Sequence, residues 1–319
     1  MSNLANRLQI RHLRLIGAIA ETGQLVLAAE RLSMTQPAAS RMLADIERDI
    51  GMALFDRHPK GMTPTEAGEA LARAAFGLLN SLDETLKEVE AIGSGRAGSV
   101  RVGAVTGAAV AFVVPAIQAL KRAAPGAEIH VDVAPSDVLI EGLMNGVYDF
   151  VLSRLPSGID ASQFHILRGR VEVIRFLVRG NHRLARAGKI SLAELAGYEW
   201  VIQAAGTPLR QAIEEALLDL GIALPRETVN TTSLLVMIAY LSSSDAVAPV
   251  SREVAELLGP GMSNAGYVAI ETDEEIIVNP YHLVSRKIHV LGPLAARLRD
   301  LVFAGLSGGA EDPRRPMAG

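Results

Sequence analysis

The sequence predicts an α/β protein with an all-α N-terminal part, a long helix and a body of two α/β lobes. Three patterns in the 319-residue chain predict this class. Apolar residues recur at helical spacing in three short segments before residue 51. Helical spacing then continues without proline from residue 65 to 92. Beyond a glycine-rich stretch at 93–98, apolar runs of strand type and helix type alternate to residue 305, as in α/β units.

The composition supports a folded chain with an uneven distribution of charge. Apolar residues make up 49% and charged residues 21%, which excludes disordered and collagen-like classes. Residues 1–65 hold eight basic and six acidic residues, whereas the remainder holds 23 basic and 29 acidic ones. There is no signal-peptide pattern and no uncharged apolar run of ~18 residues, so we expect a cytoplasmic protein without a membrane span.

Three helices are expected at 11–22, 25–32 and 36–50. Gly23 and Gly51 end the first and third of these helices, and Thr35 is the expected N-cap of the third. Two short strands are expected at 54–55 and 60–63. A polar turn of about three residues separates the second and third helices, which is helix-turn-helix geometry. In that motif the later helix enters the major groove of DNA.

Polar and small residues follow one another at the start of the third helix. Glutamine can pair with adenine, and arginine with guanine or a phosphate, while serine reaches phosphates and alanine contacts the thymine methyl group. The residues expected to face outward are Gln36, Ala38, Ser40 and Arg41. An ordinary three-helix core whose polar residues face water is the alternative that spacing alone leaves open.

Several motifs in this region resemble the LysR-type transcriptional regulators. The matching residues are Ala28-Ala29, the run TQPAASR at 35–41, LFDR at 54–57 and TPTEAG at 63–68. A weaker match includes HRLA at 182–185, residues 192–200 and VAP at 247–249. The resemblance implies a winged helix-turn-helix, a dimerising linker helix and a two-lobed effector domain like the type 2 periplasmic binding proteins.

The expected domains follow this order. Residues 1–65 form the winged helix-turn-helix, 66–98 the linker helix and hinge, and 99–307 the effector domain. Within the effector domain, lobe I comprises 99–161 and 269–307, lobe II comprises 162–268, and a disordered tail covers 308–319. The resemblance also implies the partners: double-stranded DNA with an inverted repeat, a small-molecule effector, further copies of the chain in a dimer and a tetramer, and RNA polymerase for an activator.

The residues expected to contact DNA lie on the third helix and in the wing: Gln36, Pro37, Ala38, Ser40, Arg41, Arg57 and Lys60. His58 lies beside the last two. Arg57 is expected to contact a phosphate or, alternatively, to pair with an acid inside the fold. The family usually carries hydroxyl residues where this chain has Gln24 and Val26, which puts phosphate contacts from the second helix in doubt.

The helix at 65–92 would span ~42 Å and has an apolar stripe. The residues expected to form a dimer interface on this stripe are Leu71, Leu78, Leu82 and Leu86. A helix of this length has no body of its own to pack against, so its stripe is expected to pair with a second subunit. The GSGRAG run at 93–98 matches a dinucleotide-binding fingerprint, but it follows a helix and precedes a strand, so it predicts a linker instead.

An effector cleft is expected where strands end and helices begin in the two lobes, because free amides there favour anions. The expected effector residues are Thr106, Gly107, Ser136, Arg154, Thr207 and Thr231. As the alternative, the hydroxyl residues among them only cap helices. Arg154 would suit an acid, or it would pair with a nearby carboxylate. The expected effector is a sugar or an organic or aromatic acid.

The sequence gives little support to catalysis. Cysteine is absent, the seven histidines show no metal-ligand spacing, and there is no G-x-S-x-G motif. We therefore expect no metal, no cofactor and no enzymatic activity. The predicted function is a LysR-type regulator. The alternative is a two-lobed binding protein or enzyme whose N-terminal helices serve only assembly.

Overall fold

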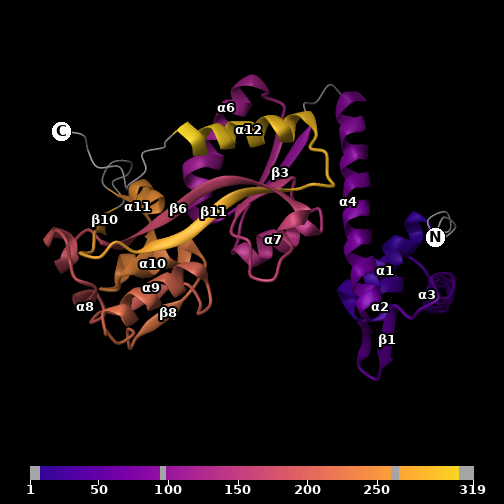
Figure 1. Ribbon diagram of the computed structural model, residues 1–319, viewed down its shortest axis with the longest axis horizontal. Coiled ribbons are helices and arrows are strands. Elements are labelled where there is room, and N and C mark those ends of the chain that lie inside the picture. The colour runs from indigo at the N-terminus through magenta and orange to yellow at the C-terminus, as the bar shows by residue number, and fades with distance from the viewer. Residues whose placement is uncertain (1–7, 94–97, 260–265, 309–319) are drawn as a thin grey trace. The chain divides into compact units, whose positions relative to one another are not determined.

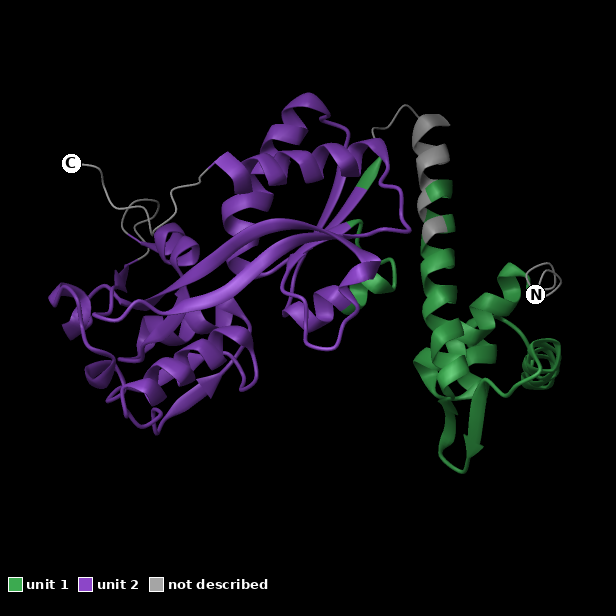
Figure 2. Ribbon diagram, viewed as in Figure 1, with its two compact units in different colours: residues 1–99, 141–149 green, residues 100–140, 150–319 purple. Residues whose placement is uncertain are grey.

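The computed structural model describes residues 8–93, 98–259 and 266–308, and Figure 1 labels its helices and strands. Two compact units divide the chain: residues 1–99 with 141–149, and residues 100–140 with 150–319 (Figure 2). The predicted linker at 94–97 and the predicted tail from residue 309 lie outside the described residues. Among the described helices, none combines the length and apolar character of a membrane span.

The N-terminal unit is a three-helix head followed by a two-stranded wing. Its helices and strands are α1 (Ile10–Thr22), α2 (Leu25–Arg31), α3 (Gln36–Ile50), β1 (Phe55–His58) and β2 (Gly61–Pro64). Gly23 and Gly51 end α1 and α3 with φ of 64° and 83°, as predicted. Thr35 is the N-cap residue of α3, but its side chain makes no capping hydrogen bond. Pro37 removes one of the two N–H groups that an N-cap side chain can reach.

One apolar core holds the head together and sets which side of α3 faces outward. Leu15, Ile16 and Ile19 of α1 are fully buried, and they pack in one cluster with Leu43 and Ile46 of α3. Burying each such side chain contributes about 1.5–3 kcal/mol. The opposite side of α3 is therefore left for solvent or for a partner.

The wing is fixed to both ends of the helix-turn-helix. The N–H of Met62 donates to the carbonyl of Gly23 at 2.7 Å. Gly61 has a φ of 141°, and a Cβ there would lie 2.3 Å from the same carbonyl oxygen, so only glycine fits. The Glu47 carboxylate accepts from the N–H of Leu54 at 2.8 Å. These contacts couple the position of the wing to α1 and α3.

The long helix α4 (Glu66–Gly93) begins at a hydroxyl cap. The N–H of Gly68 donates to the Thr65 hydroxyl at 3.1 Å, and that hydroxyl donates to the carbonyl of Ala53 at 2.9 Å. Further along α4, Leu78 and Leu86 are 60% and 53% exposed. Two leucines of the predicted stripe therefore lack a partner within the described part of this chain.

The second unit contains most of the sheet structure. Its strands are β3 (Ser99–Ala104), β4 (Glu128–Val133), β5 (Phe150–Ser153), β6 (Phe164–Arg179), β7 (Trp200–Ile202), β8 (Thr228–Asn230), β9 (Ala248–Ser251), β10 (Tyr267–Ile270) and β11 (Ile277–Arg286). The main sheet has the order β10-β6-β11-β5-β3-β4, and β9 also pairs with β6. Strands β7 and β8 form a separate parallel pair.

Two long strands connect the two ends of this sheet (Figure 1). One end of β6 pairs with β11, which continues to β5, while its other end pairs with β9 and β10. The sequence predicted shorter strands, at 171–178 and 282–286. Their first halves were missed because charged residues such as Arg168 and Arg170 interrupt the apolar pattern there, and cross-strand hydrogen bonds stabilise those halves instead.

The helices of this unit are α5 (Thr106–Ala108), α6 (Val114–Ala123), α7 (Ser136–Met144), α8 (Leu192–Leu195), α9 (Pro208–Asp219), α10 (Leu234–Ser243), α11 (Arg252–Leu258) and α12 (Pro293–Gly308), with a π-helical segment η1 (Ala109–Val113) and short 3₁₀ segments η2 (Ala161–Gln163) and η3 (Arg183–Arg186). The predicted continuous helix at 108–123 is thus interrupted by η1. Pro115 has no N–H to donate, which breaks the ordinary helical hydrogen-bond pattern. The helix α11 was not predicted.

Separate apolar clusters stabilise this unit. Trp200 of β7 packs with Phe176 of β6 at a ring-centroid distance of 5.1 Å. Ile270, Ile276 and Val278 belong to the same cluster. The predicted lobe boundary at 268/269 remains a prediction, and these three side chains pack on the lobe II side of it.

Candidate functional site

The outward side of α3 carries the residues that the sequence singled out. Gln36, Pro37 and Arg41 are exposed, whereas Ala38 and Ser40 are half-buried. The Nε of Arg41 donates to the carbonyl of Pro37 at 3.4 Å. Among the described residues Arg41 has no carboxylate partner, so its charge is available to another molecule.

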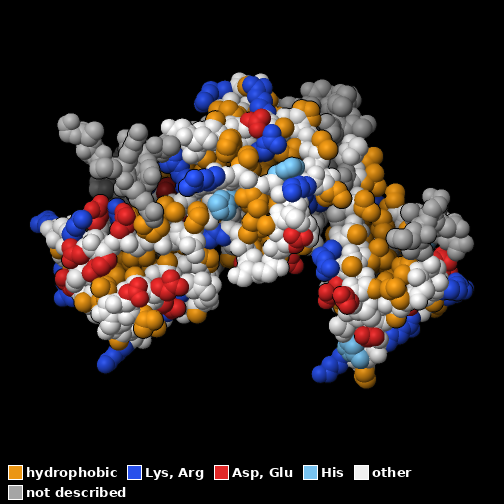
Figure 3. Space-filling model, viewed as in Figure 1, with side chains coloured by type: hydrophobic (Ala, Val, Ile, Leu, Met, Phe, Trp, Pro, Cys, Tyr) orange, Lys and Arg blue, Asp and Glu red, His pale blue; other side chains and the backbone are white. Residues whose placement is uncertain are grey.

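The wing adds further uncompensated positive charge. Arg57 and Lys60 are exposed and form no ion pair within the described ranges, so Arg57 does not make the internal pair considered as its alternative. The ring of His58 bonds to the Thr63 hydroxyl at 2.8 Å and accepts from the N–H of Lys60 at 3.3 Å, which stiffens the loop. Figure 3 shows basic side chains and a histidine together at the tip of this wing.

The helix α2 differs from α3 in this respect. Gln24 precedes α2, and its side chain makes no capping hydrogen bond. Val26 and Leu27 are 47% and 44% exposed. The first turn of α2 therefore presents apolar side chains where hydroxyls were expected from the resemblance, and phosphate contacts are left to α3 and the wing.

In the second unit, all six predicted effector residues line one pocket, which we call the strand-end pocket. Its volume is about 910 Å³ including the part open to solvent, within the range of small-molecule sites. The polar and charged residues of its lining are Thr106, Ser136, Arg154, Glu172, Gln203, Thr207, Thr231, Thr232 and Ser251, together with Gly107 and apolar residues such as Val133, Leu234 and Val250. They lie where strands end and helices begin.

Arg154 is already paired in this pocket. Its guanidinium forms an ion pair with Glu172 of β6, and its Nε donates to the carbonyl of Asn279 of β11 at 2.6 Å. The two side chains are only 11% and 8% exposed. Of the two interpretations that the sequence left open for Arg154, the structure therefore contains the ion pair.

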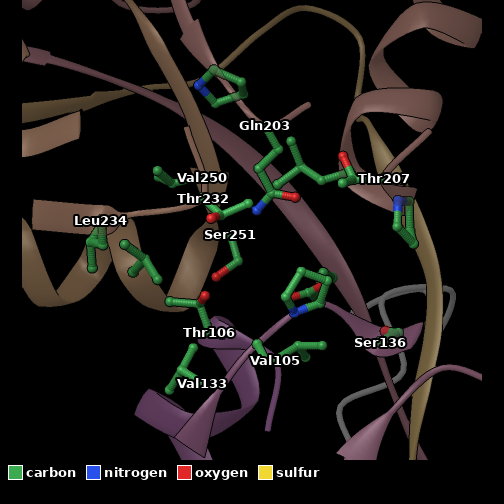
Figure 4. Close-up of a pocket in the computed structure, with 18 of the residues that line it drawn as sticks. Val105, Thr106, Val133, Ser136, Gln203, Thr207, Thr232, Leu234, Val250 and Ser251 are labelled. Atoms are coloured by element: carbon green, nitrogen blue, oxygen red, sulfur yellow. The ribbon is translucent and has the colours of Figure 1, made fainter. Parts of the chain in front are cut away.

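Three polar residues of the pocket were missed by the sequence. Gln203 follows β7, Glu172 lies within β6, and Ser251 ends β9 just before α11. In Figure 4, Gln203 and Ser251 point toward the same space, with Thr106 opposite. A serine followed by an acid and apolar residues marks a helix start, so Ser251 had a local signal. Glu172 had none, since its partner lies 18 residues away.

Two titratable side chains beside the ion pair stay neutral near pH 7. Burial raises the pKa of the Tyr281 phenol, and the carboxylates of Glu253 and Glu172 reinforce the shift. Burial lowers the pKa of His282, and the charge of Arg154 adds to this effect. The formal charges in the lining of the strand-end pocket are thus those of Arg154 and Glu172 alone.

Comparison with protein families identifies the chain. Residues 10–69 match the bacterial regulatory helix-turn-helix of the lysR family, and residues 93–307 match the LysR substrate binding domain. The chain is a member of the LysR family of transcription regulators. The LysR family consists of regulators rather than enzymes, so the chain is a DNA-binding regulator with an effector-binding domain.

Curated relatives of this LysR-family regulator cover most of the chain. It is 39% identical over 77% of its length to the transcriptional regulator GbpR of Rhizobium radiobacter, of which it covers 82%. It is 35% identical over 91% of its length to GbpR of Azospirillum brasilense, of which it covers 84%.

Solved LysR-family structures share the fold of this regulator. The regulator CbnR bound to its target DNA matches 93% of the chain and 100% of its own length, with a TM-score of 0.63 and 21% identity. ArgP from Mycobacterium tuberculosis matches 95% of the chain and 98% of its own length, with a TM-score of 0.65 and 19% identity. Among the described residues of this LysR-family chain, no group of three His, Cys, Asp or Glu side chains is placed to hold a metal ion.

Proposed function

We propose that this regulator reads its operator with α3 and the wing, and that a small molecule bound in the strand-end pocket changes its activity. The DNA-reading residues are Gln36, Pro37, Ala38, Ser40 and Arg41 of α3 and Arg57 and Lys60 of the wing. The observation that carries the DNA part is that Arg41, Arg57 and Lys60 are exposed and form no ion pair within the described residues. Basic side chains of this kind neutralise phosphates or pair with base edges.

The proposed assembly is a dimer formed through α4, with pairs of dimers forming a tetramer on an inverted-repeat operator. Exposed Leu78 and Leu86 support the dimer, because apolar side chains at helical spacing are covered in helix pairs. The proposed effector residues are Thr106, Gly107, Ser136, Arg154, Thr207 and Thr231, which line one pocket.

Capture of genomic fragments by the full-length protein tests the proposal. Fragments that share an inverted repeat should be retained, and their affinity should fall steeply as salt rises, because phosphate neutralisation releases counterions. Retention without sequence preference, or an affinity insensitive to salt, would contradict the DNA-binding role of the head. The captured operator then serves for measuring how added metabolites change binding.

A further inference from the structure

The strand-end pocket combines a neutralised ion pair with hydrogen-bonding groups that have no charge. Arg154 and Glu172 are its only charged lining residues, and each is the other's partner. An acidic ligand would meet an arginine whose charge is already used, beside a buried carboxylate. An amine would meet the reverse arrangement. Neither finds a free counter-charge, and a charge buried without one is strongly disfavoured.

Hydrogen-bond donors reach the pocket from the starts of three helices. Val105 is the N-cap residue of α5 and has no side-chain acceptor, and Pro135 immediately precedes α7. At the start of α9 the Thr207 hydroxyl donates to the carbonyl of Ala204 at 2.8 Å and does not cap the helix. The first-turn N–H groups of these helices therefore have no side-chain cap, and such groups need an acceptor.

Groups that can both donate and accept lie on the other side of the pocket. Ser251 is 5% exposed, and its hydroxyl has no hydrogen-bond partner within the described structure. Gln203 and Thr232 point toward the same space in Figure 4. A Cβ on Gly107 would lie 2.6 Å from the Ser251 Oγ and 2.7 Å from the Glu172 Oε1, so a glycine is needed where these polar atoms gather.

From this arrangement we propose that the effector is an uncharged molecule rich in hydroxyl groups, of about the size of a monosaccharide. A hydroxyl accepts from helix-start amides and donates to a serine, a glutamine carbonyl or a carboxylate, whereas a carboxylate group only accepts. The proposal rests on the proposed function of the same pocket and selects one of the ligand classes that the sequence left open. Glu172 is the residue that determines this specificity.

Calorimetric titration of the full-length protein with matched ligands tests the charge preference. The panel contains the aldopentoses and aldohexoses, and for each the uronic acid and the amino sugar of the same configuration, together with simple aromatic acids. A neutral sugar should bind, and its charged counterparts should bind at least ~10-fold more weakly, since their charge would be desolvated without compensation.

The variant Glu172→Gln tests the assigned cause. Removing the carboxylate frees Arg154, so the ratio of uronic-acid to neutral-sugar affinity should rise at least ~10-fold. The matched control is Glu271→Gln, which removes the partner of Arg175 outside the pocket lining and should leave the ratio unchanged. A second variant, Ser251→Ala, removes a hydroxyl without a protein partner, so it should weaken the neutral ligand without lowering the unfolding temperature of the free protein.

The outcomes separate this proposal from the proposed function. A wild-type protein that binds its operator but takes up no neutral sugar, or that prefers an acid or an amino sugar, overturns the ligand class. An unchanged affinity ratio in Glu172→Gln, in a variant that folds, overturns the role of the ion pair, and for a variant that does not fold an unchanged sugar affinity in Ser251→Ala overturns the assigned site. Loss of operator binding by the wild-type protein refutes the proposed function instead.

Discussion

The basic residues of the head and those of the effector part differ in whether their partners lie within the chain. Arg154 in the strand-end pocket has a buried carboxylate partner, and Arg175, Arg179 and Arg210 are also in ion pairs. Arg41 in α3 has no such partner among the described residues. An arginine therefore indicates an anionic ligand only when its own chain leaves the charge uncompensated. This criterion favours nucleic acid at the head and an uncharged effector in the pocket.

The largest effect is expected when the buried pair is broken. Arg154→Ala should lower the free energy of unfolding by about 3–5 kcal/mol, because Glu172 is left buried without its counter-charge. Denaturant titration measures this loss. Arg299→Ala is the control, since Arg299 pairs with Asp300 at a more exposed position.

A double variant separates the lost pairing from lost packing. Arg154→Met combined with Glu172→Gln leaves no orphan charge, so it should recover much of the stability that Arg154→Ala loses. If Arg154→Ala is as stable as the wild type, the ion pair is not what holds these strands, and the contrast between the two regions disappears.

Leucines of α4 extend the comparison from charge to apolar surface. Leu78 is 60% exposed in the single chain, so Leu78→Asp should leave the fold intact but prevent dimerisation. Operator affinity should then fall at least ~100-fold, because the two half-sites are no longer bound together. Light scattering reports the mass, and Arg73→Asp, with the same new side chain on the opposite side of α4, should remain dimeric. A dimeric Leu78→Asp protein would place the interface elsewhere.

The sequence predicted local features better than it predicted long-range partners. The ends of α1 and α3 follow from Gly23 and Gly51, which need only their own backbone conformation. The pocket residues Thr106, Ser136 and Thr207 follow from the rule that ligands gather where strands end and helices begin. Arg154 was placed correctly in the pocket lining, but its bond to Asn279 spans 125 residues.

The same limit explains the missed elements. The first half of β6 is stabilised by pairing with β11, more than a hundred residues later, and its alternation is masked by charged residues. Tertiary hydrogen bonds of this kind leave no local pattern. The predicted DNA-contact and dimer residues concern other molecules, so their roles await the experiments described here.

Arg41 tests the unpaired side of the comparison. Arg41→Ala should weaken operator binding by about 1–3 kcal/mol if the guanidinium pairs with a base edge. Stability should change little, because the exposed side chain has only a 3.4 Å contact to the Pro37 carbonyl. Fluorescence anisotropy with operator variants should also show relaxed preference at one base position. Equal affinity for the operator before and after the substitution would remove Arg41 from the reading residues.

The smallest effect is expected on the same helix, at a position that is already paired. Arg48 forms an ion pair with Asp45, and the two side chains are 72% and 62% exposed. Solvent screens such a pair, so Arg48→Ala should change stability by about 0.5 kcal/mol or less. Operator affinity should also change much less than in Arg41→Ala, although both substitutions remove one positive charge from α3. If the two variants lose equal affinity at every salt concentration, total charge and not internal pairing decides which arginines of the head serve DNA.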